Sequence, residues 1–320
     1  MSDLPPLRTP EELAHWRNEH LASGLLDETL LTRYSHVPDL VAFIDETHPS
    51  TDGGEVTYYG LSAVIFHADN LPEIRKELEA ISGRGYWHAK DEFRRPGQKR
   101  KDDIERMAAY INEKAAKPIV VFDLKKGELS EGADERKMRD YVLRSMLKHL
   151  NDEGIRDVVL DTFPKALSHN VEADKAILTR LQWDGSVDAD MWIHHAQMRK
   201  EHALWAADTV VWAAQRSELG KREGDSRFIA PLAPNLHHMQ ARTGLKVPPV
   251  VQPEAVREAN QKRRPPIFDM PTRIRQAREA KEKLEKARRD SAVKRGVNTQ
   301  SPARPITPPT TRREGPTQSR

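Results

Sequence analysis

Three aspartates of this chain occur where carboxylate chemistry is expected. Asp45 and Asp161 each end a short apolar run of the kind that forms a buried strand, and Asp208 lies among apolar residues in a helix-like stretch. Open α/β sheets bind their ligands near such strand ends. Carboxylate oxygens are the ligands that Mg²⁺ and Mn²⁺ prefer. The three residues together predict a divalent-metal site.

Two of these aspartates also have a simpler interpretation. A carboxylate that follows a strand, such as Asp45, commonly accepts hydrogen bonds within a turn. Asp208 would lose solvation among its alanine and valine neighbours. An ion pair with Arg199, Lys200 or Arg216 would offset that cost, as a metal ion would. The metal interpretation is favoured because the three carboxylates occur together.

Apolar periodicity and turn residues predict the elements that must position these side chains. Strands are predicted over residues 39–45, 56–66, 118–124 and 155–161, with a short one at 191–194. Helices are predicted within residues 1–36 and over 69–82, 102–114, 134–152, 199–219 and 271–295, with a helical centre in 170–184; residues 86–92 are either a strand or a loop. This order of elements predicts a mixed α/β sheet flanked by helices.

Composition narrows the class of protein. The chain has 320 residues and no cysteine, so it can bury a sizeable core but holds neither disulfides nor zinc–thiolate sites. No apolar run reaches the roughly 20 residues that a membrane-spanning helix needs. The first residues show no signal-peptide pattern. We therefore expect a cytoplasmic protein that has no membrane contact.

The net charge of +3 is unevenly distributed. Residues 262–320 hold 17 Lys and Arg against 6 Asp and Glu, a net charge of +11, which leaves −8 for the rest of the chain. A basic arm on an acidic body is typical of a segment that contacts nucleic-acid phosphates. The alternative is a solvated, disordered tail.

Several motifs of the chain, taken together, resemble a known family. They are VAFIDETH at 41–48 with YYGLSAVIF at 58–66, the triplet His88-Ala89-Lys90, IRDVVLD at 155–161 and LWAADTVVWAAQR at 204–216. Over about residues 38–220 the chain resembles the proteins classed as domain of unknown function 3800, which are met in bacterial and phage genomes. The resemblance implies an RNase H-like fold and a metal-dependent nuclease activity.

The resemblance also implies a set of site residues, namely Asp45, Glu46, His88, Asp161 and Asp208. In a two-metal centre the ions lie roughly 3.5–4 Å apart. Asp45 would bridge the two Mg²⁺ or Mn²⁺ ions, and Asp161 and Asp208 would each hold one. RNase H-like enzymes often add an acid from an early helix. The candidates for that acid are Glu46, Asp91 and Glu92.

His88 is the one imidazole in this set. An imidazole exchanges protons near neutral pH, so His88 would orient water or move a proton. The alternative is a structural histidine beside Trp87. Basic residues cluster in the same part of the sequence and would form either a phosphate-contacting loop or a solvated one. They are Lys90, Arg94, Arg95, Lys99, Arg100 and Lys101.

These interpretations divide the chain into five segments. They are a helical segment (1–36), an RNase H-like domain (37–222), a proline-containing linker (223–270), a charged helix (271–295) and a disordered basic tail (296–320). The predicted function is that of a nuclease that hydrolyses phosphodiester bonds of DNA or RNA. The alternative is a non-catalytic RNase H-like module that binds nucleic acid or a protein partner. No Gly-rich phosphate loop supports a nucleotide transferase.

Overall fold

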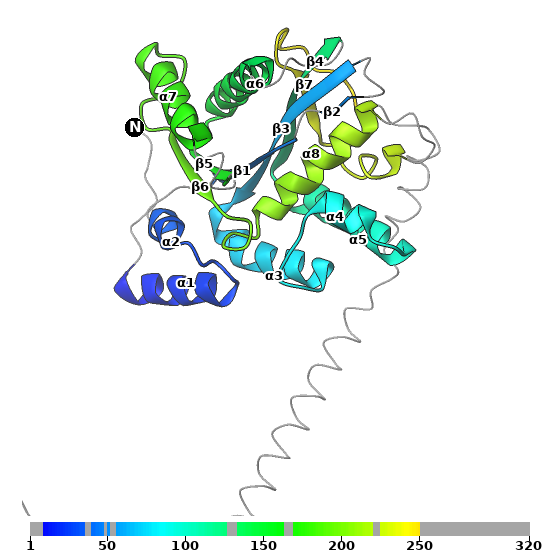
Figure 1. The fold of residues 1–320 in the computed structure, drawn as a ribbon. Coiled ribbons are helices and arrows are strands. Elements are labelled where there is room, and N and C mark those ends of the chain that lie inside the picture. The colour runs from blue at the N-terminus through cyan, green and yellow to red at the C-terminus, as the bar shows by residue number, and fades with distance from the viewer. Residues whose placement is uncertain are drawn as a thin grey trace, which may run out of the picture. The chain divides into compact units, whose positions relative to one another are not determined.

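The strands form one mixed sheet of seven strands in the order β6–β5–β1–β3–β4–β7, with β2 paired to β3 (Figure 1). The structure, a computed structural model, describes residues 9–35, 40–47, 50–51, 56–126, 133–162, 169–219 and 225–249. The strands are β1 (Leu40–Glu46), β2 (Ser50–Thr51), β3 (Val56–His67), β4 (Lys117–Lys126), β5 (Asp157–Asp161), β6 (Trp192–Ala196) and β7 (His237–Gln240). Strand β3 runs antiparallel to both β1 and β4, whereas β5, β6 and β7 pair in parallel with their neighbours.

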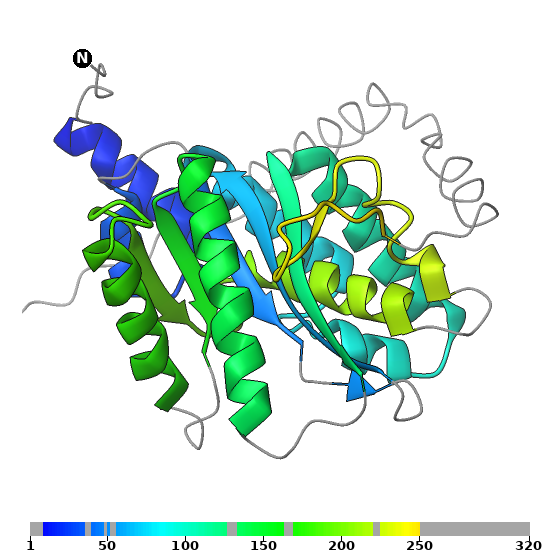
Figure 2. The ribbon, with the colours of Figure 1, turned by 90° about the horizontal axis from the view of Figure 1, so that it is seen from above.

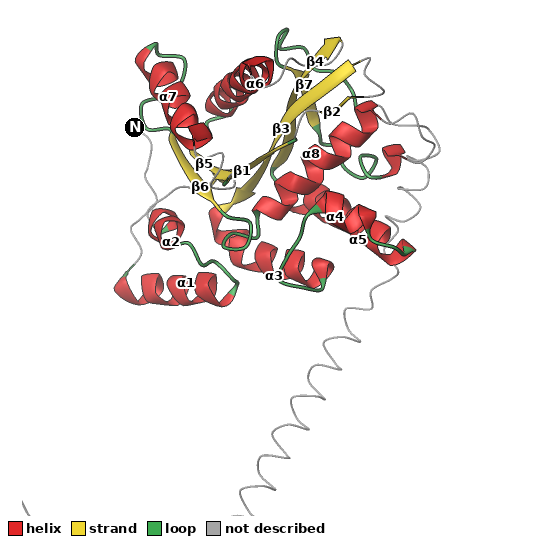
Figure 3. Ribbon diagram, in the orientation of Figure 1, coloured by secondary structure: helices red, strands yellow, loops and turns green. Residues whose placement is uncertain are grey.

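Helices cover both faces of this sheet (Figures 2 and 3). The side that we call the α8 face packs against α1 (Pro10–Ala22), α2 (Glu28–Tyr34), α3 (Leu71–Ser82), α4 (Ala89–Arg94), α5 (Gln98–Lys114) and α8 (Leu204–Leu219). The opposite side, the α6 face, packs against α6 (Ala133–Asp152) and α7 (His169–Trp183). The mixed sheet flanked by helices that the sequence predicts is confirmed. Among the described residues, no helix combines the length and apolar character needed to cross a membrane.

Strand β1 is buried on both faces, and its alternation decides where the site can lie. Val41 and Phe43 belong to the core under the α8 face, and Ala42 and Ile44 belong to the core under the α6 face. Successive side chains of a strand point to opposite faces. The residue after Ile44 therefore points toward α8, and the next one points toward α6.

Three helix boundaries differ from the sequence-based expectation. Residues 86–92, expected as a strand or a loop, contain the start of the short helix α4, which begins after the extended backbone of His88. Helix α5 begins at Gln98, four residues early, because Gly97 adopts a positive φ and turns the chain into it. Helix α8 begins only at Leu204, because the Glu201 side chain accepts the backbone N–H of Ala203 at 2.9 Å in a preceding turn.

The linker expected over residues 223–270 is wrong for the part that the structure describes. Strand β7 extends the sheet beside β4, with His237 opposite Ile119. Just before it, Phe228, Ile229 and Leu232 are buried in the core under the α8 face. The strand has only four residues, too few to show a period in the sequence. The charged helix at 271–295 and the basic tail at 296–320 lie outside the described residues.

A chain that ends at residue 224 is expected to be much less stable than one that ends at residue 250. The shorter chain loses β7 and the buried side chains of Phe228, Ile229 and Leu232. Each such side chain contributes about 1.5–3 kcal/mol on burial, which together is a large share of the roughly 5–15 kcal/mol that holds a domain folded. Thermal unfolding of the two chains checks this, with Leu232→Ala in the full chain as a graded control. Equal melting temperatures would contradict the role assigned to β7.

Candidate metal centre

Asp45 and Asp161 lie side by side at the carboxyl ends of adjacent parallel strands. Strands β1 and β5 pair with Ile44 opposite Leu160, so the next residue along each strand is an aspartate. Neighbouring strands lie about 4.8 Å apart, and side chains in register point to the same face. Since Ile44 points toward α6, both aspartates point toward α8.

Helix α8 brings Asp208 to the same place. Ser62 lies directly opposite Asp45 in the β1–β3 pair. Its hydroxyl donates a hydrogen bond of 2.7 Å to the backbone carbonyl of Ala207. This bond ties α8 to the sheet one residue away from Asp208, beside the position of Asp45. The three aspartates therefore converge on one face of the sheet from two strands and a helix.

The start of α4 holds the Asp208 carboxylate. The backbone N–H of Ala89 donates to its Oδ2 at 2.6 Å, and Nδ1 of His88 lies 3.2 Å from its Oδ1. The neighbouring residue Trp87 is buried and donates its ring N–H to the hydroxyl of Thr209 at 3.0 Å, which anchors the segment to α8. The His88 side chain is 41% exposed, so this imidazole reaches both the carboxylate and solvent.

The three carboxylates disfavour one another's ionised form. Burial and the charges of Asp208 and Asp161 raise the pKa of Asp45 well above its usual range. Burial, with the charge of Asp208, raises the pKa of Asp161 to about 7 although two backbone amides oppose the shift. Burial also raises the pKa of Asp208, and His88 and the Ala89 amide offset part of the rise. A bound cation would stabilise all three carboxylates as anions.

Asp91 is the acid of α4 that is a candidate for this site. It is half-buried, and its charge contributes to the raised pKa of Asp208. Glu92, the other candidate on this helix, is buried and lies 3.0 Å from Arg95 and 3.4 Å from Arg84. Because Glu92 is used in these ion pairs, which stabilise α4, Asp91 is the better candidate for a fourth carboxylate beside Asp45, Asp161 and Asp208.

Glu46 is placed on the α6 face, opposite the aspartates, so the structure contradicts its assignment as a site residue. Arg139 donates its Nε–H to Glu46 at 2.9 Å, and the Tyr59 hydroxyl donates to the same oxygen. Arg139 also binds Asp174, with Nη2 at 3.0 Å, and Nε2 of His195 lies 2.9 Å from that carboxylate. Glu46 is therefore part of a buried ionic cluster that joins β1 to α6, α7 and β6. Adjacent residues of a strand point to opposite faces, so sequence adjacency to Asp45 is misleading here.

The three aspartates supply the oxygen ligands that Mg²⁺ or Mn²⁺ prefers, but they do not form a complete coordination sphere. In the part of the chain that the structure describes, no three His, Cys, Asp or Glu side chains are grouped closely enough to hold a metal ion directly. Mg²⁺ usually keeps several waters and binds proteins through one or two carboxylates. Aspartates that share a face without forming a closed group of three ligands, and whose pKa values are raised by burial and by neighbouring charges, fit such a hydrated ion. The metal site stays a prediction.

Comparison with known proteins gives only distant likenesses. No family model and no curated protein matches the chain. A mutant of Bst-RNase HIII is 11% identical with a TM-score of 0.31; the match covers 66% of this chain and 57% of that one. Bst-RNase HIII in complex with Mn²⁺ is also 11% identical with a TM-score of 0.31, and the match covers 82% and 77% of the two chains. A chain of the PCNA:RNase HII complex from Archaeoglobus fulgidus is 16% identical with a TM-score of 0.26, and the match covers 54% and 70%.

TM-scores of this size assign neither a fold nor an activity. The architecture described above stands on the chain's own strand order and register. The resemblance to the family classed as domain of unknown function 3800 stays a prediction, since no family model matches.

Proposed function

We propose that this protein is a divalent-metal-dependent nuclease that hydrolyses phosphodiester bonds of DNA or RNA. The observation that carries the proposal is the convergence of Asp45, Asp161 and Asp208 on the α8 face. Two of them are strand neighbours, and the third is held by the start of α4. Burying several carboxylates together is costly unless a cation compensates them, and a hard divalent cation is the partner that oxygen donors select.

The chain's own residues have distinct roles in this proposal. Asp45 and Asp161 would hold the cation from the sheet, and Asp208 would hold it from α8, with the Asp208 carboxylate oriented by the Ala89 amide. When bound, Mg²⁺ or Mn²⁺ would neutralise charge at the scissile phosphate and make water a better nucleophile at neutral pH. His88, next to Asp208 and partly exposed, would pass a proton between the reacting oxygens and solvent.

Five of the six basic residues near α4 separate into two groups, and the sixth, Lys101, lies over the ring of Phe93. Arg95 and Arg100 lie 3.0 Å and 3.7 Å from the buried Glu92, so they stabilise the fold. The exposed cations Lys90, Arg94 and Lys99 have no acidic partner within the described part of the chain. They are the side chains that we expect to contact the phosphates of a bound strand. The basic residues after 262, outside the described part, would add affinity that falls with salt.

The purified protein is expected to cleave labelled DNA or RNA in Mg²⁺ or Mn²⁺ and to leave both intact in EDTA. Single-stranded DNA, duplex DNA and RNA should be tested in parallel, with binding measured on the same samples. Cleavage that persists unchanged in EDTA would contradict a metal centre. Binding without cleavage under every metal condition would instead support the non-catalytic module.

A further inference from the structure

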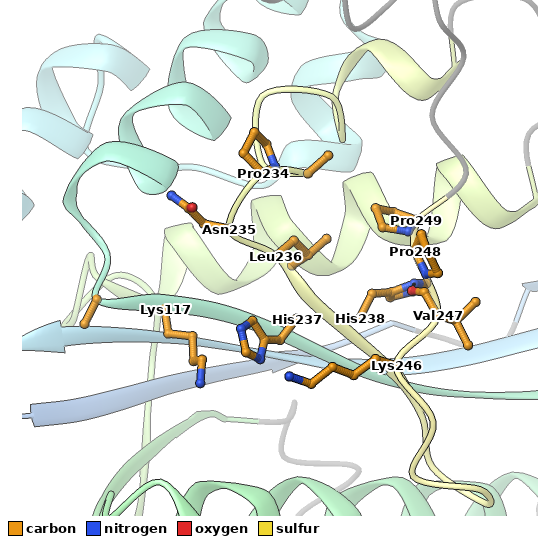
Figure 4. Close-up of a pocket in the computed structure, with 12 residues that line it drawn as sticks. Lys117, Pro234, Asn235, Leu236, His237, His238, Lys246, Val247, Pro248 and Pro249 are labelled. Carbon is orange, nitrogen blue, oxygen red and sulfur yellow. Dashed lines mark hydrogen bonds between the residues drawn. The ribbon is translucent and has the colours of Figure 1, made fainter.

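A second charged cluster lies at the edge of the sheet, where β4 and β7 begin, and it is separate from the three aspartates. A pocket of about 500 Å³ opens there and is shown in Figure 4. Its lining comes from Ala116, Lys117, residues 233–238 and residues 246–249. Pockets of roughly 300–1,000 Å³ are the size that accommodates small-molecule ligands.

Positive charge is concentrated on one side of this pocket. In Figure 4 the Lys246 amine points toward the ring of His237, and the Lys117 side chain lies beyond it. Burial is the largest cause that lowers the pKa of His237, and the charges of Lys117, Lys246 and His149 lower it further. Glu153 faces the group, with the Lys117 Nζ 2.7 Å from its Oε1, and a second acid, Glu218, lies 3.9 Å from Nδ1 of the pocket residue His238. Lys117 is paired with Glu153, whereas the exposed Lys246 has no acidic partner among the described residues, so this amine favours an anionic ligand.

Two imidazole nitrogens of this cluster lack a hydrogen-bond partner in the described part of the chain. They are Nδ1 of His237 and Nε2 of His149, on rings whose centroids are 6.4 Å apart. Buried polar atoms are usually paired. A simpler interpretation, in which the cluster only docks the end of α6 on the sheet, accounts for the Lys117–Glu153 pair and for Nε2 of His149, which lies 3.7 Å from the Glu153 carboxylate, but it leaves Nδ1 of His237 unused. A metal ion is disfavoured because two lysine amines would repel it.

The other side of the pocket is apolar. It is formed by Ala233, Pro234, Leu236, Val247, Pro248 and Pro249. Apolar side chains of this kind line ligand pockets and give a wall against which a ring of the ligand can pack. A ligand that fits both sides therefore carries an anionic group at one end and a flat, largely apolar ring at the other.

We propose that this pocket binds a nucleoside monophosphate, with the phosphate between Lys117, His237 and Lys246 and the base against the proline wall. Lysine amines bind phosphate as point charges, and charge-assisted hydrogen bonds are stronger than neutral ones. The proposal is independent of the nuclease activity, since it uses no residue of the candidate metal centre.

Isothermal titration calorimetry of the full chain in EDTA tests the proposal. Omitting divalent cations keeps phosphate from binding at the carboxylates. The probes are adenosine 5′-monophosphate, adenosine and inorganic phosphate. We expect one site for the monophosphate and affinities about ten-fold or more weaker for the other two probes, which each lose one half of the contacts.

Two variants locate the site. Lys246→Glu and His237→Gln are each expected to weaken the monophosphate about ten-fold or more, while Lys76→Glu, an exposed charge reversal on α3, should leave it unchanged. Equal binding of adenosine and its monophosphate, or unchanged affinity in both pocket variants, would overturn the proposal. A single-stranded oligonucleotide that binds in place of the monophosphate and is weakened by Lys246→Glu would also overturn it, because the pocket would then hold a strand.

Discussion

Replacing Asp45 by Asn is expected to abolish cleavage and, at the same time, to stabilise the metal-free protein near neutral pH. Cleavage should fall by about 1,000-fold, on the order of 4 kcal/mol in the barrier, because one of the three carboxylates that would hold the metal is lost. The stability gain follows from the raised pKa values of Asp45 and Asp161. A folded-state pKa above the unfolded one means that the folded protein binds more protons, so stability falls as pH rises.

The pH window follows from the Asp161 carboxyl, whose pKa is raised from 3.8 to about 7. Without metal, wild-type stability should therefore decline from about pH 4 to pH 7, and Asp45→Asn should flatten that decline by removing one of the repelling charges. Thermal unfolding across this range in EDTA, with and without added Mg²⁺, gives the measurement. Added Mg²⁺ should raise the wild-type melting temperature and leave that of Asp45→Asn nearly unchanged.

A matched substitution is available on α6. Asp140 is 44% exposed and pairs with Arg144 at 3.0 Å. It has no role in the candidate metal centre. Asp140→Asn removes the same charge and should change neither cleavage nor the pH dependence of stability. Full cleavage by Asp45→Asn, or a metal-free Asp45→Asn protein that is less stable than wild type near neutral pH, would refute the carboxylate site.

Arg139→Met is expected to destabilise the protein by about 3–5 kcal/mol, because it removes the charge that compensates two buried carboxylates. Glu46 and Asp174 both bind this guanidinium, and the Asp174 side chain is fully buried. Burial is the first cause that raises the pKa of Glu46, and Arg139 opposes it. Without Arg139, protonation of Glu46 becomes easier, so the defect should shrink as pH falls from about 7 to about 5.

Urea unfolding at both pH values measures this effect, and Arg144→Met on the same helix is its control. Arg144 makes a partly exposed pair with Asp140, of a kind that contributes about 1 kcal/mol or less. If Arg139→Met leaves stability unchanged but weakens metal binding, Glu46 belongs to the metal centre and the placement on the α6 face is wrong.

The sequence predicts the parts of this molecule that are long or strongly patterned. Strand β3 and the helices α3 and α6 have the periods expected for their burial, and their boundaries fall within two residues of the prediction. The three aspartates are recognisable in the sequence because each interrupts or ends an apolar segment. That they share one face is a matter of register, which depends on the pairing of β1 with β5.

Other features are set by contacts that the sequence does not contain. Phe43 and Ile44 are both apolar, so the pattern in β1 does not reveal which neighbour of the strand end faces α8 and which faces α6. Strand β7 is recognisable only through its pairing with β4. The cluster around His237 joins residues from α6, β4 and the segment after β7. Two of them, Lys117 and Lys246, lie more than a hundred positions apart in the sequence.

The position of β7 also bears on how the chain avoids self-association. Strand β4 carries the apolar run Ile119–Phe122, and β7 pairs with these four residues. The outer side of β7 is occupied in turn, since Val247 donates its N–H to the carbonyl of His238. An uncovered apolar strand edge is a template for pairing between molecules. A protein shortened before β7 would therefore be lost from solution by edge-to-edge assembly into aggregates, at a rate that rises with protein concentration.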